Sequence, residues 1–128
     1  MTQVEKVDPT PEDIQRLLAE AGDQPFVMLN LLRYAKDGGR ETYAQYAAAA
    51  QPFLEGVGGE LLYAGDTGLA LVAPGAHDWD TVLLVRYPSP QAFLEMVSNP
   101  DYLKVTEIRT RALDAAVLQV TTPWAESP

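Results

Sequence analysis

The stretch from residue 79 to residue 109 constrains the fold more than any other part of this chain. Its first part, residues 79–87, carries apolar side chains on both sides of an alternating pattern, which predicts a strand covered on both faces. Ser89-Pro90 and Asn99-Pro100 each match an N-cap followed by proline at the first helical position. The stretch therefore predicts a buried strand, a short helix and a second helix over about residues 100–115.

Before this stretch the pattern alternates between helix and strand. Thr10 and Pro11 predict an N-cap and a helix start, Asp13 stands at the capping-box position, and Gly22 can end that helix. The remaining elements follow from period-2 or period-3.6 apolar spacing and from glycine-rich breaks. They are a strand over 26–34, a helix over about 40–57, a strand over 60–64 that continues in extended form over 69–73, and a last strand over 117–122.

Without the leading helix, the predicted order is β-α-β-β-α-β. Two right-handed crossovers place both helical segments on one face of a four-stranded antiparallel sheet, so the fold class is α+β with a ferredoxin-like sandwich and an extra N-terminal helix. The opposite face stays bare although its strands are apolar on both sides. A soluble monomer rarely exposes such a face, so we expect it to pack on a second copy, as a homodimer. The alternative is that the leading helix covers it, but a helix of about ten residues covers only part of a sheet.

Composition excludes several classes of function. The 128 residues suit one domain, and a net charge of -9 argues against nucleic-acid and anionic-membrane partners because no basic patch can neutralise phosphates. The chain has no cysteine, and its one histidine, His77, stands in a predicted surface loop, so a two-histidine metal site would need two chains. Neither a signal peptide nor an apolar run long enough to span a membrane is present, and a cytoplasmic location is the expectation.

The chain also resembles a known family in its motifs. The chain resembles the DUF1330 family of the dimeric α/β-barrel superfamily in MLNLLRY (28–34), the pair Tyr43 and Tyr46, GVGGELLYAG (56–65), WDTVLLVRYPSPQAFLEMVSNPDY (79–102) and RTRAL (109–113). The resemblance covers residues 25–122, and it leaves an N-terminal arm and helix over 1–24 and a tail over 123–128. It implies a dimeric α/β barrel with relatives that include cofactor-free monooxygenases, haem-degrading enzymes and isomerases. Haem-binding relatives place their axial histidine on a helix, which His77 does not match, so no cofactor is expected.

Two polar residues stand at positions where the pattern predicts the core. Arg109 lies roughly 40° from the centre of the apolar stripe of the last helix, with Tyr102 at roughly 60°. A buried guanidinium needs an anion or several acceptors, so Arg109 is either paired within the protein or holds a carboxylate or enolate-like oxygen of a ligand. Asn30 interrupts an apolar strand, and its amide either fixes the fold or the dimer, or donates to a substrate oxygen.

Aromatic residues accompany these two. Tyr43 and Tyr46 lie on the sheet-facing stripe of the helix over 40–57, and Tyr63, Trp79 and Tyr87 stand on neighbouring strands. Such residues more often fill a core than contact a ligand, but buried hydroxyls need partners in either case.

Two functional hypotheses follow. In the first, a pocket between sheet and helices binds a small anionic or carbonyl-bearing molecule, with Arg109 and Asn30 as catalytic candidates for proton transfer or cofactor-free oxygenation. The substrate-binding candidates are Tyr43, Tyr46, Tyr63, Trp79 and Tyr102. In the second, the protein is a non-enzymatic homodimeric or stress-associated binding module, and these residues only satisfy one another.

Overall fold

The computed structural model describes residues 7–73 and 78–124. Four helices and four strands follow one another in these residues. They are α1 (Pro11–Glu20), β1 (Phe26–Tyr34), α2 (Gly39–Gly56), β2 (Glu60–Asp66), β3 (Thr81–Tyr87), α3 (Pro90–Ser98), α4 (Pro100–Ala112) and β4 (Leu113–Thr121).

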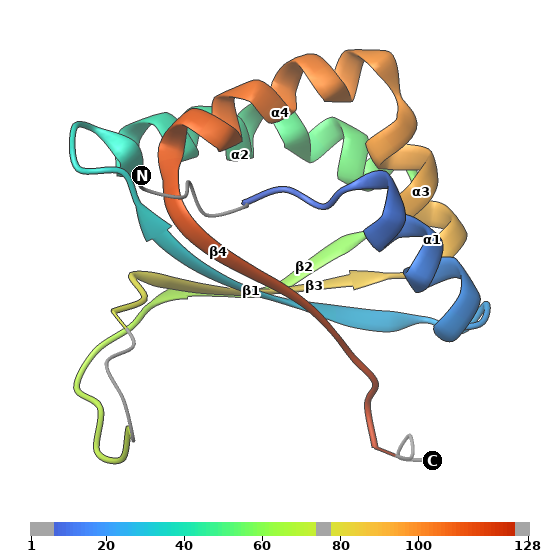
Figure 1. Ribbon diagram of the computed structural model, residues 1–128, viewed down its shortest axis with the longest axis horizontal. Coiled ribbons are helices and arrows are strands. Elements are labelled where there is room, and N and C mark those ends of the chain that lie inside the picture. Colours follow the sequence, from blue (N-terminus) through green and yellow to red (C-terminus); the bar gives the residue numbers. More distant parts are fainter. Residues whose placement is uncertain (1–6, 74–77, 125–128) are drawn as a thin grey trace.

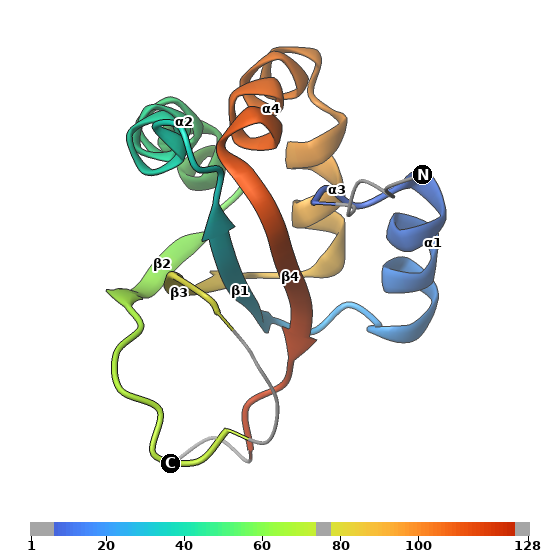
Figure 2. The ribbon, with the colours of Figure 1, turned by 60° about the vertical axis from the view of Figure 1, so that its left-hand side comes forward.

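The four strands form one antiparallel sheet in the order β2-β3-β1-β4. All four helices lie on the same side of this sheet, and the other side carries no helix (Figure 1). This arrangement confirms the predicted α+β, ferredoxin-like fold. Figure 2 shows α1 next to α3 at the β4 edge of the sheet. The leading helix therefore does not cover the opposite face, and that alternative is wrong.

The helix starts follow the capping residues that the sequence contains. The Thr10 side chain accepts a hydrogen bond from the backbone of Asp13, whose carboxylate accepts one from the Thr10 backbone at 2.8 Å. Ser89 caps α3 and Asn99 caps α4, each followed by proline at the first helical position. These bonds satisfy amide groups that a helix start leaves without partners.

Several predicted boundaries differ from the structure, and the last strand begins at Leu113 rather than at residue 117. The helix predicted to extend to residue 115 ends at Ala112, because Leu113 already pairs with Tyr34 of β1. Residues 69–73, predicted as an extended continuation of β2, form no strand. They belong to the connection from β2 to β3, whose described part extends away from the sheet on the side opposite the helices (Figure 1).

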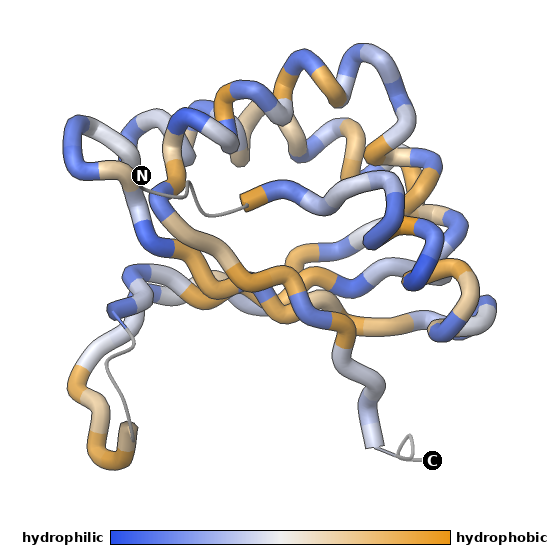
Figure 3. The backbone as a smooth tube through the Cα atoms, in the orientation of Figure 1, coloured by the Kyte–Doolittle hydropathy of each residue, from blue (hydrophilic) through white to orange (hydrophobic). Residues whose placement is uncertain are grey.

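The core lies between the sheet and the helices. Phe26, Met28, Asn30 and Leu32 of β1 are buried on the helical side, while Val27, Leu29 and Leu31 point to the uncovered side and are half-buried. On the uncovered side, Leu29 pairs with Leu84 of β3 and Leu31 with Val82. Hydrophobic residues occupy much of the length of the central strands β1 and β3 (Figure 3), as expected for strands that are apolar on both faces.

Candidate functional site

A cavity of about 580 Å³ lies between the helical side of the sheet and helices α1, α3 and α4. Its apolar wall includes Met28 of β1, Phe93 and Met96 of α3, and Leu118 of β4. Its polar residues include Asn30, Tyr46, Tyr102, Thr106 and Arg109, together with Asp8 and Thr10 from the segment before α1. The cavity thus contains most of the residues that the sequence marks as candidates.

Arg109 is 4 % exposed, which confirms that the arginine in the apolar stripe of α4 is buried. Its Nη1 donates to the Asp8 carboxylate at 2.6 Å and also to the Val7 carbonyl oxygen. The other Asp8 oxygen accepts a hydrogen bond from the Thr110 hydroxyl at 2.6 Å. The segment before α1 therefore supplies the anion that a buried guanidinium requires.

Two buried polar atoms of the cavity residues have no hydrogen-bond partner among the residues that the structure describes. They are Nη2 of Arg109 and Oγ1 of Thr106, which stand one helical turn apart on α4. An unsatisfied buried donor costs about 1–3 kcal/mol, so folded proteins rarely keep one without a ligand or a water molecule. Pairing with Asp8 thus satisfies only one side of the guanidinium.

Asn30 is 8 % exposed and lies on the helical face of β1. Its side-chain Nδ2 donates to the carbonyl oxygen of Met28 at 3.1 Å, two residues earlier on the same strand. An amide group has two donor hydrogens and an acceptor oxygen, so this one bond leaves further hydrogen-bonding capacity at the cavity wall.

Tyr46 of α2 and Tyr102 of α4 share a hydrogen bond between their hydroxyls at 2.6 Å. Burial raises the pKa of Tyr46 well above its usual value, and the neighbouring phenol of Tyr102 raises it further. Burial also raises the pKa of Tyr43 to about 12, although the positive charge of Arg109 partly offsets this. Tyr43 and Tyr46 are therefore uncharged phenols at neutral pH, and they cannot act as bases there.

Of the other predicted aromatic residues, Tyr87 also lines this cavity, and the remaining ones lie elsewhere. The Tyr43 ring packs 5.3 Å from the Tyr46 ring, behind the cavity wall. Tyr63 is 54 % exposed on β2 and pairs with Leu84, which faces the uncovered side of the sheet. Trp79 precedes β3 at the base of the β2–β3 connection, where its carbonyl oxygen accepts from the Thr67 hydroxyl. The structure brings neither Tyr63 nor Trp79 to the cavity that contains Arg109.

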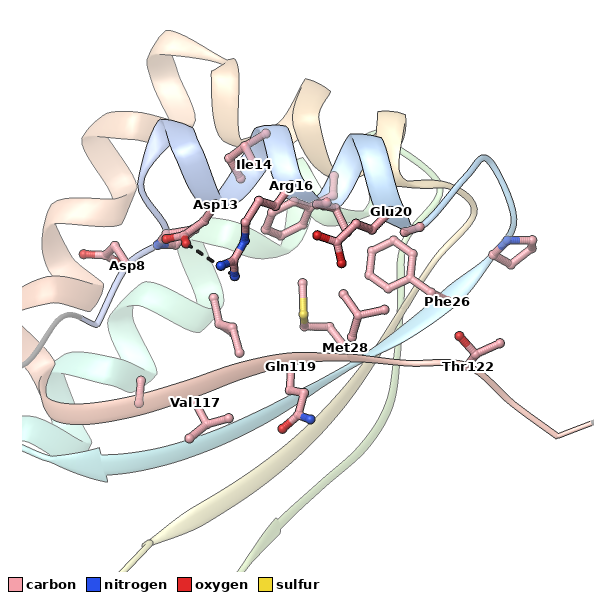
Figure 4. A pocket seen from close by; sticks show the side chains of 18 of the residues that line it. Asp8, Asp13, Ile14, Arg16, Glu20, Phe26, Met28, Val117, Gln119 and Thr122 are labelled. Carbon is pink, nitrogen blue, oxygen red and sulfur yellow. Dashed lines mark ion pairs between the residues drawn. The ribbon is translucent and has the colours of Figure 1, made fainter.

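A second, more open cavity of about 800 Å³ lies between α1 and β4. Figure 4 shows charged side chains on its α1 side, where Arg16 forms an ion pair with Asp13 at 3.9 Å and Glu20 lies one turn further along. Met28 and Phe26 enter it from the sheet side (Figure 4). Both cavities share Asp8, Pro9, Ile14, Met28, Phe93 and Leu118. Helix α1, which has no buried residue, therefore lies over hollow space on both sides.

Asp8 and Thr106 are site residues that were not predicted from the sequence. Thr106 does carry a signal, because it stands four residues after Tyr102 and three before Arg109 and so shares their side of the helix. Asp8 carries none, since it precedes the first helix and only the fold brings it to Arg109, 101 residues away.

Within residues 7–73 and 78–124, no three acidic, histidine or cysteine side chains come together to hold a metal ion. No helix in these ranges has both the length and the apolar character needed to cross a membrane. His77 lies outside the described residues.

Comparisons with known proteins agree with the fold. The family model described as domain of unknown function DUF1330 matches residues 35–123. The crystal structure of RPA0582, a protein of unknown function from Rhodopseudomonas palustris, is 32 % identical with a TM-score of 0.84, and the match covers 94 % of this chain and 98 % of that one. No curated protein matches this chain.

More distant structures share the fold alone. A hydroxynitrile lyase from Passiflora edulis is 15 % identical with a TM-score of 0.63, over 83 % of this chain and 99 % of that one. A dimeric ferredoxin-like protein of unknown function from Bacteroides fragilis is 10 % identical with a TM-score of 0.53, over 77 % and 95 %. The match of the family model to more than half of the chain, with the likeness to RPA0582, shows that this protein belongs to the DUF1330 family.

Proposed function

We propose that the cavity beside Arg109 binds a small molecule that carries a carbonyl or anionic oxygen. The observation that carries this proposal is a pair of buried polar atoms, Arg109 Nη2 and Thr106 Oγ1, that have no hydrogen-bond partner within residues 7–73 and 78–124 and belong to two residues lining a cavity of about 580 Å³. That volume lies within the range of small-molecule sites, and a mostly apolar wall with a few polar groups is typical of them.

Binding accounts for the site more completely than turnover does. Asp8 is the one carboxylate among the described lining residues, which include no histidine and no lysine, and it is engaged by Arg109 and Thr110. The raised pKa of Tyr46 keeps that phenol protonated. A reaction that removes a proton from its substrate needs a base of suitable pKa, and these residues offer little basicity.

The catalytic form of the proposal uses the same residues. Arg109 and Asn30 would hold an enolate oxygen during proton transfer or cofactor-free oxygenation, as donors that stabilise developing negative charge. Asp8 would then have to leave Arg109 and accept the proton. Turnover without any change in the Asp8–Arg109 pair would count against this form.

A screen of small carbonyl compounds and carboxylates by NMR tests the proposal. Arg109→Met should remove the binding of every hit, while Arg111→Met, an exposed residue of the same helix, should leave the hits unchanged. If Arg109→Met instead raises the stability of the protein and keeps the hits, the arginine has only a structural role and the proposed site is wrong.

We also propose that the protein is a homodimer in which the uncovered sheet faces pack on one another, as in a dimeric α/β barrel. Val27, Leu29 and Leu31 of β1 form an apolar row on that face, with Val82 and Leu84 beside it on β3. A flat apolar face can pack on its own copy around a two-fold axis. The Bacteroides fragilis protein of the same fold is described as dimeric, which agrees with this proposal.

The described part of the β2–β3 connection adds to the apolar surface on that side. Leu69, Leu71 and Val72 are each at least 88 % exposed, and such a group of exposed apolar side chains marks an interaction surface. Light scattering after size exclusion tests the dimer. A mass near twice the 14.0 kDa of one chain is expected, and the mass of one chain at micromolar concentration would contradict the proposal.

A further inference from the structure

The charge of the cavity is already balanced by the protein itself. Arg109 is its one cationic residue among the described lining residues, and Asp8 is its one anionic residue. The two lie 2.6 Å apart, and Thr110 holds the second Asp8 oxygen, so the carboxylate is fixed from both sides. The pair is formally neutral, and the guanidinium has no uncompensated charge to offer to a ligand.

What remains at the site is hydrogen-bonding capacity. Nη2 of Arg109 is a donor without a partner in the described residues, and the Thr106 hydroxyl can donate or accept. A neutral carbonyl oxygen can accept a hydrogen bond from such a donor, as a carboxylate oxygen can. A carboxylate would also bring a second negative charge next to Asp8 in a largely apolar enclosure, and burying an uncompensated charge is costly.

The surroundings also disfavour an anion. Asp13 and Glu20 line the adjoining cavity against one arginine, Arg16, and the whole chain has a net charge of -9. The apolar wall of the site, with Met28, Phe93 and Leu118, suits an apolar body in the ligand.

We propose that the cavity takes an uncharged molecule with an apolar body and a carbonyl oxygen, such as a ketone, ester or amide, and that Asp8 determines this preference. This inference rests on the proposed binding function and narrows its ligand class. The carbonyl oxygen accepts from Nη2 of Arg109, and the apolar body lies against the strands and α3. Asp8 acts as an internal anion that excludes carboxylates from the guanidinium.

Benzamide and benzoate test this inference, because they have nearly the same shape and differ in charge. We expect NMR titration of the full chain to give benzamide a dissociation constant at least roughly tenfold lower than that of benzoate. Asp8→Asn keeps the shape of the side chain and releases the charge of Arg109, so it should tighten benzoate binding by roughly tenfold and largely remove the preference for benzamide. Glu107→Gln removes one negative charge from an exposed position of α4, as Asp8→Asn does at the cavity, and it should leave the preference for benzamide unchanged.

The outcomes separate the two proposals. Benzoate binding as tight as benzamide in the wild-type protein overturns the inference on its own, even if Asp8→Asn fails to fold, and leaves the binding site in place. An Asp8→Asn protein that folds and keeps the wild-type preference overturns the role of Asp8. If neither probe perturbs the lining residues of either protein, and the broader screen finds no ligand that depends on Arg109, the proposed function itself fails.

Discussion

The carboxylate of Asp8 and the guanidinium of Arg109 lie 2.6 Å apart across 101 positions of the chain. The pair attaches the segment before α1 to α4. Loss of the pair would leave the two side chains in different surroundings, because the Arg109 side chain is 5 % exposed and the Asp8 side chain is 28 % exposed. Asp8 can regain water when the pair is broken, whereas Arg109 cannot without a movement of the chain.

This asymmetry predicts the effect of Asp8→Ala. The change removes the carboxylate from a buried guanidinium, which keeps its hydrogen bond to the Val7 carbonyl, so the free energy of unfolding should fall by about 3 kcal/mol. Thr110→Ala removes only the hydrogen bond to the second Asp8 oxygen and should cost about 1 kcal/mol. Urea unfolding measures both values. Equal losses in the two variants would mean that the charge pair adds nothing beyond one hydrogen bond.

The hydroxyl pair of Tyr46 and Tyr102 predicts strong coupling between two substitutions. Each single change to phenylalanine leaves the other buried hydroxyl without its partner and should cost about 1–2 kcal/mol. The double change removes both polar atoms and should cost clearly less than the sum of the singles. A double-mutant cycle from urea unfolding measures this coupling. Additive losses would show that each hydroxyl finds another partner.

The buried phenols predict a loss of stability at alkaline pH. The folded-state pKa of Tyr43 is raised to about 12 from an ordinary value near 10. The folded protein therefore holds this proton more tightly than the unfolded chain, and stability is full below pH 10 and falls as pH rises toward 12. Tyr43 alone accounts for roughly 2–3 kcal/mol across this range. Unfolding followed by circular dichroism at several pH values measures the decline, and Tyr43→Phe should make it shallower.

Gly39 predicts a steric limit at the start of α2. A Cβ atom there would lie 2.6 Å from the carbonyl oxygen of Ala112, the last residue of α4. Gly39→Ala should therefore destabilise the fold by about 1–3 kcal/mol. At the end of the same helix, Gly56 has nothing within 4 Å of such an atom, so Gly56→Ala should be neutral or stabilise by up to about 1 kcal/mol. Thermal unfolding compares the two, and similar melting temperatures would contradict the steric argument.

Local patterns predicted most of the fold because their causes are local. Thr10, Ser89 and Asn99 cap the helices that their sequence positions predict. Residues 69–73 have the composition of a strand but form none. The pairing between β2 and β3 ends at Asp66 and Thr81, so β3 does not extend far enough to pair with residues 69–73. Strand formation needs a partner, and spacing along one segment does not reveal whether that partner is present.

The candidate site was predicted only in part, for the same reason. The helical pattern of α4 placed Arg109 and Tyr102 in the core, and both are buried. The sequence did not predict which face of β1 carries Asn30. In the structure Asn30 pairs with Leu83 and Leu118 and lies on the helical side of the sheet. The partner of Arg109 was not predictable, because Asp8 is one of 18 acidic residues and comes to α4 through tertiary structure alone.

The uncovered sheet face gives the last prediction, which concerns the proposed homodimer. Leu29 lies in the centre of this face, between Leu84 of β3 and Gln119 of β4. Leu29→Lys would place charges against one another across a two-fold interface, so the dimer should dissociate and the mass should fall to that of one chain. Ala48→Lys adds the same charge on the exposed side of α2 and should leave the assembly unchanged. Light scattering after size exclusion measures both, with circular dichroism as the check on folding. A Leu29→Lys protein that is folded and still dimeric would place the interface on another surface, since a sheet-to-sheet contact cannot bury two lysines at its centre without a large loss of affinity.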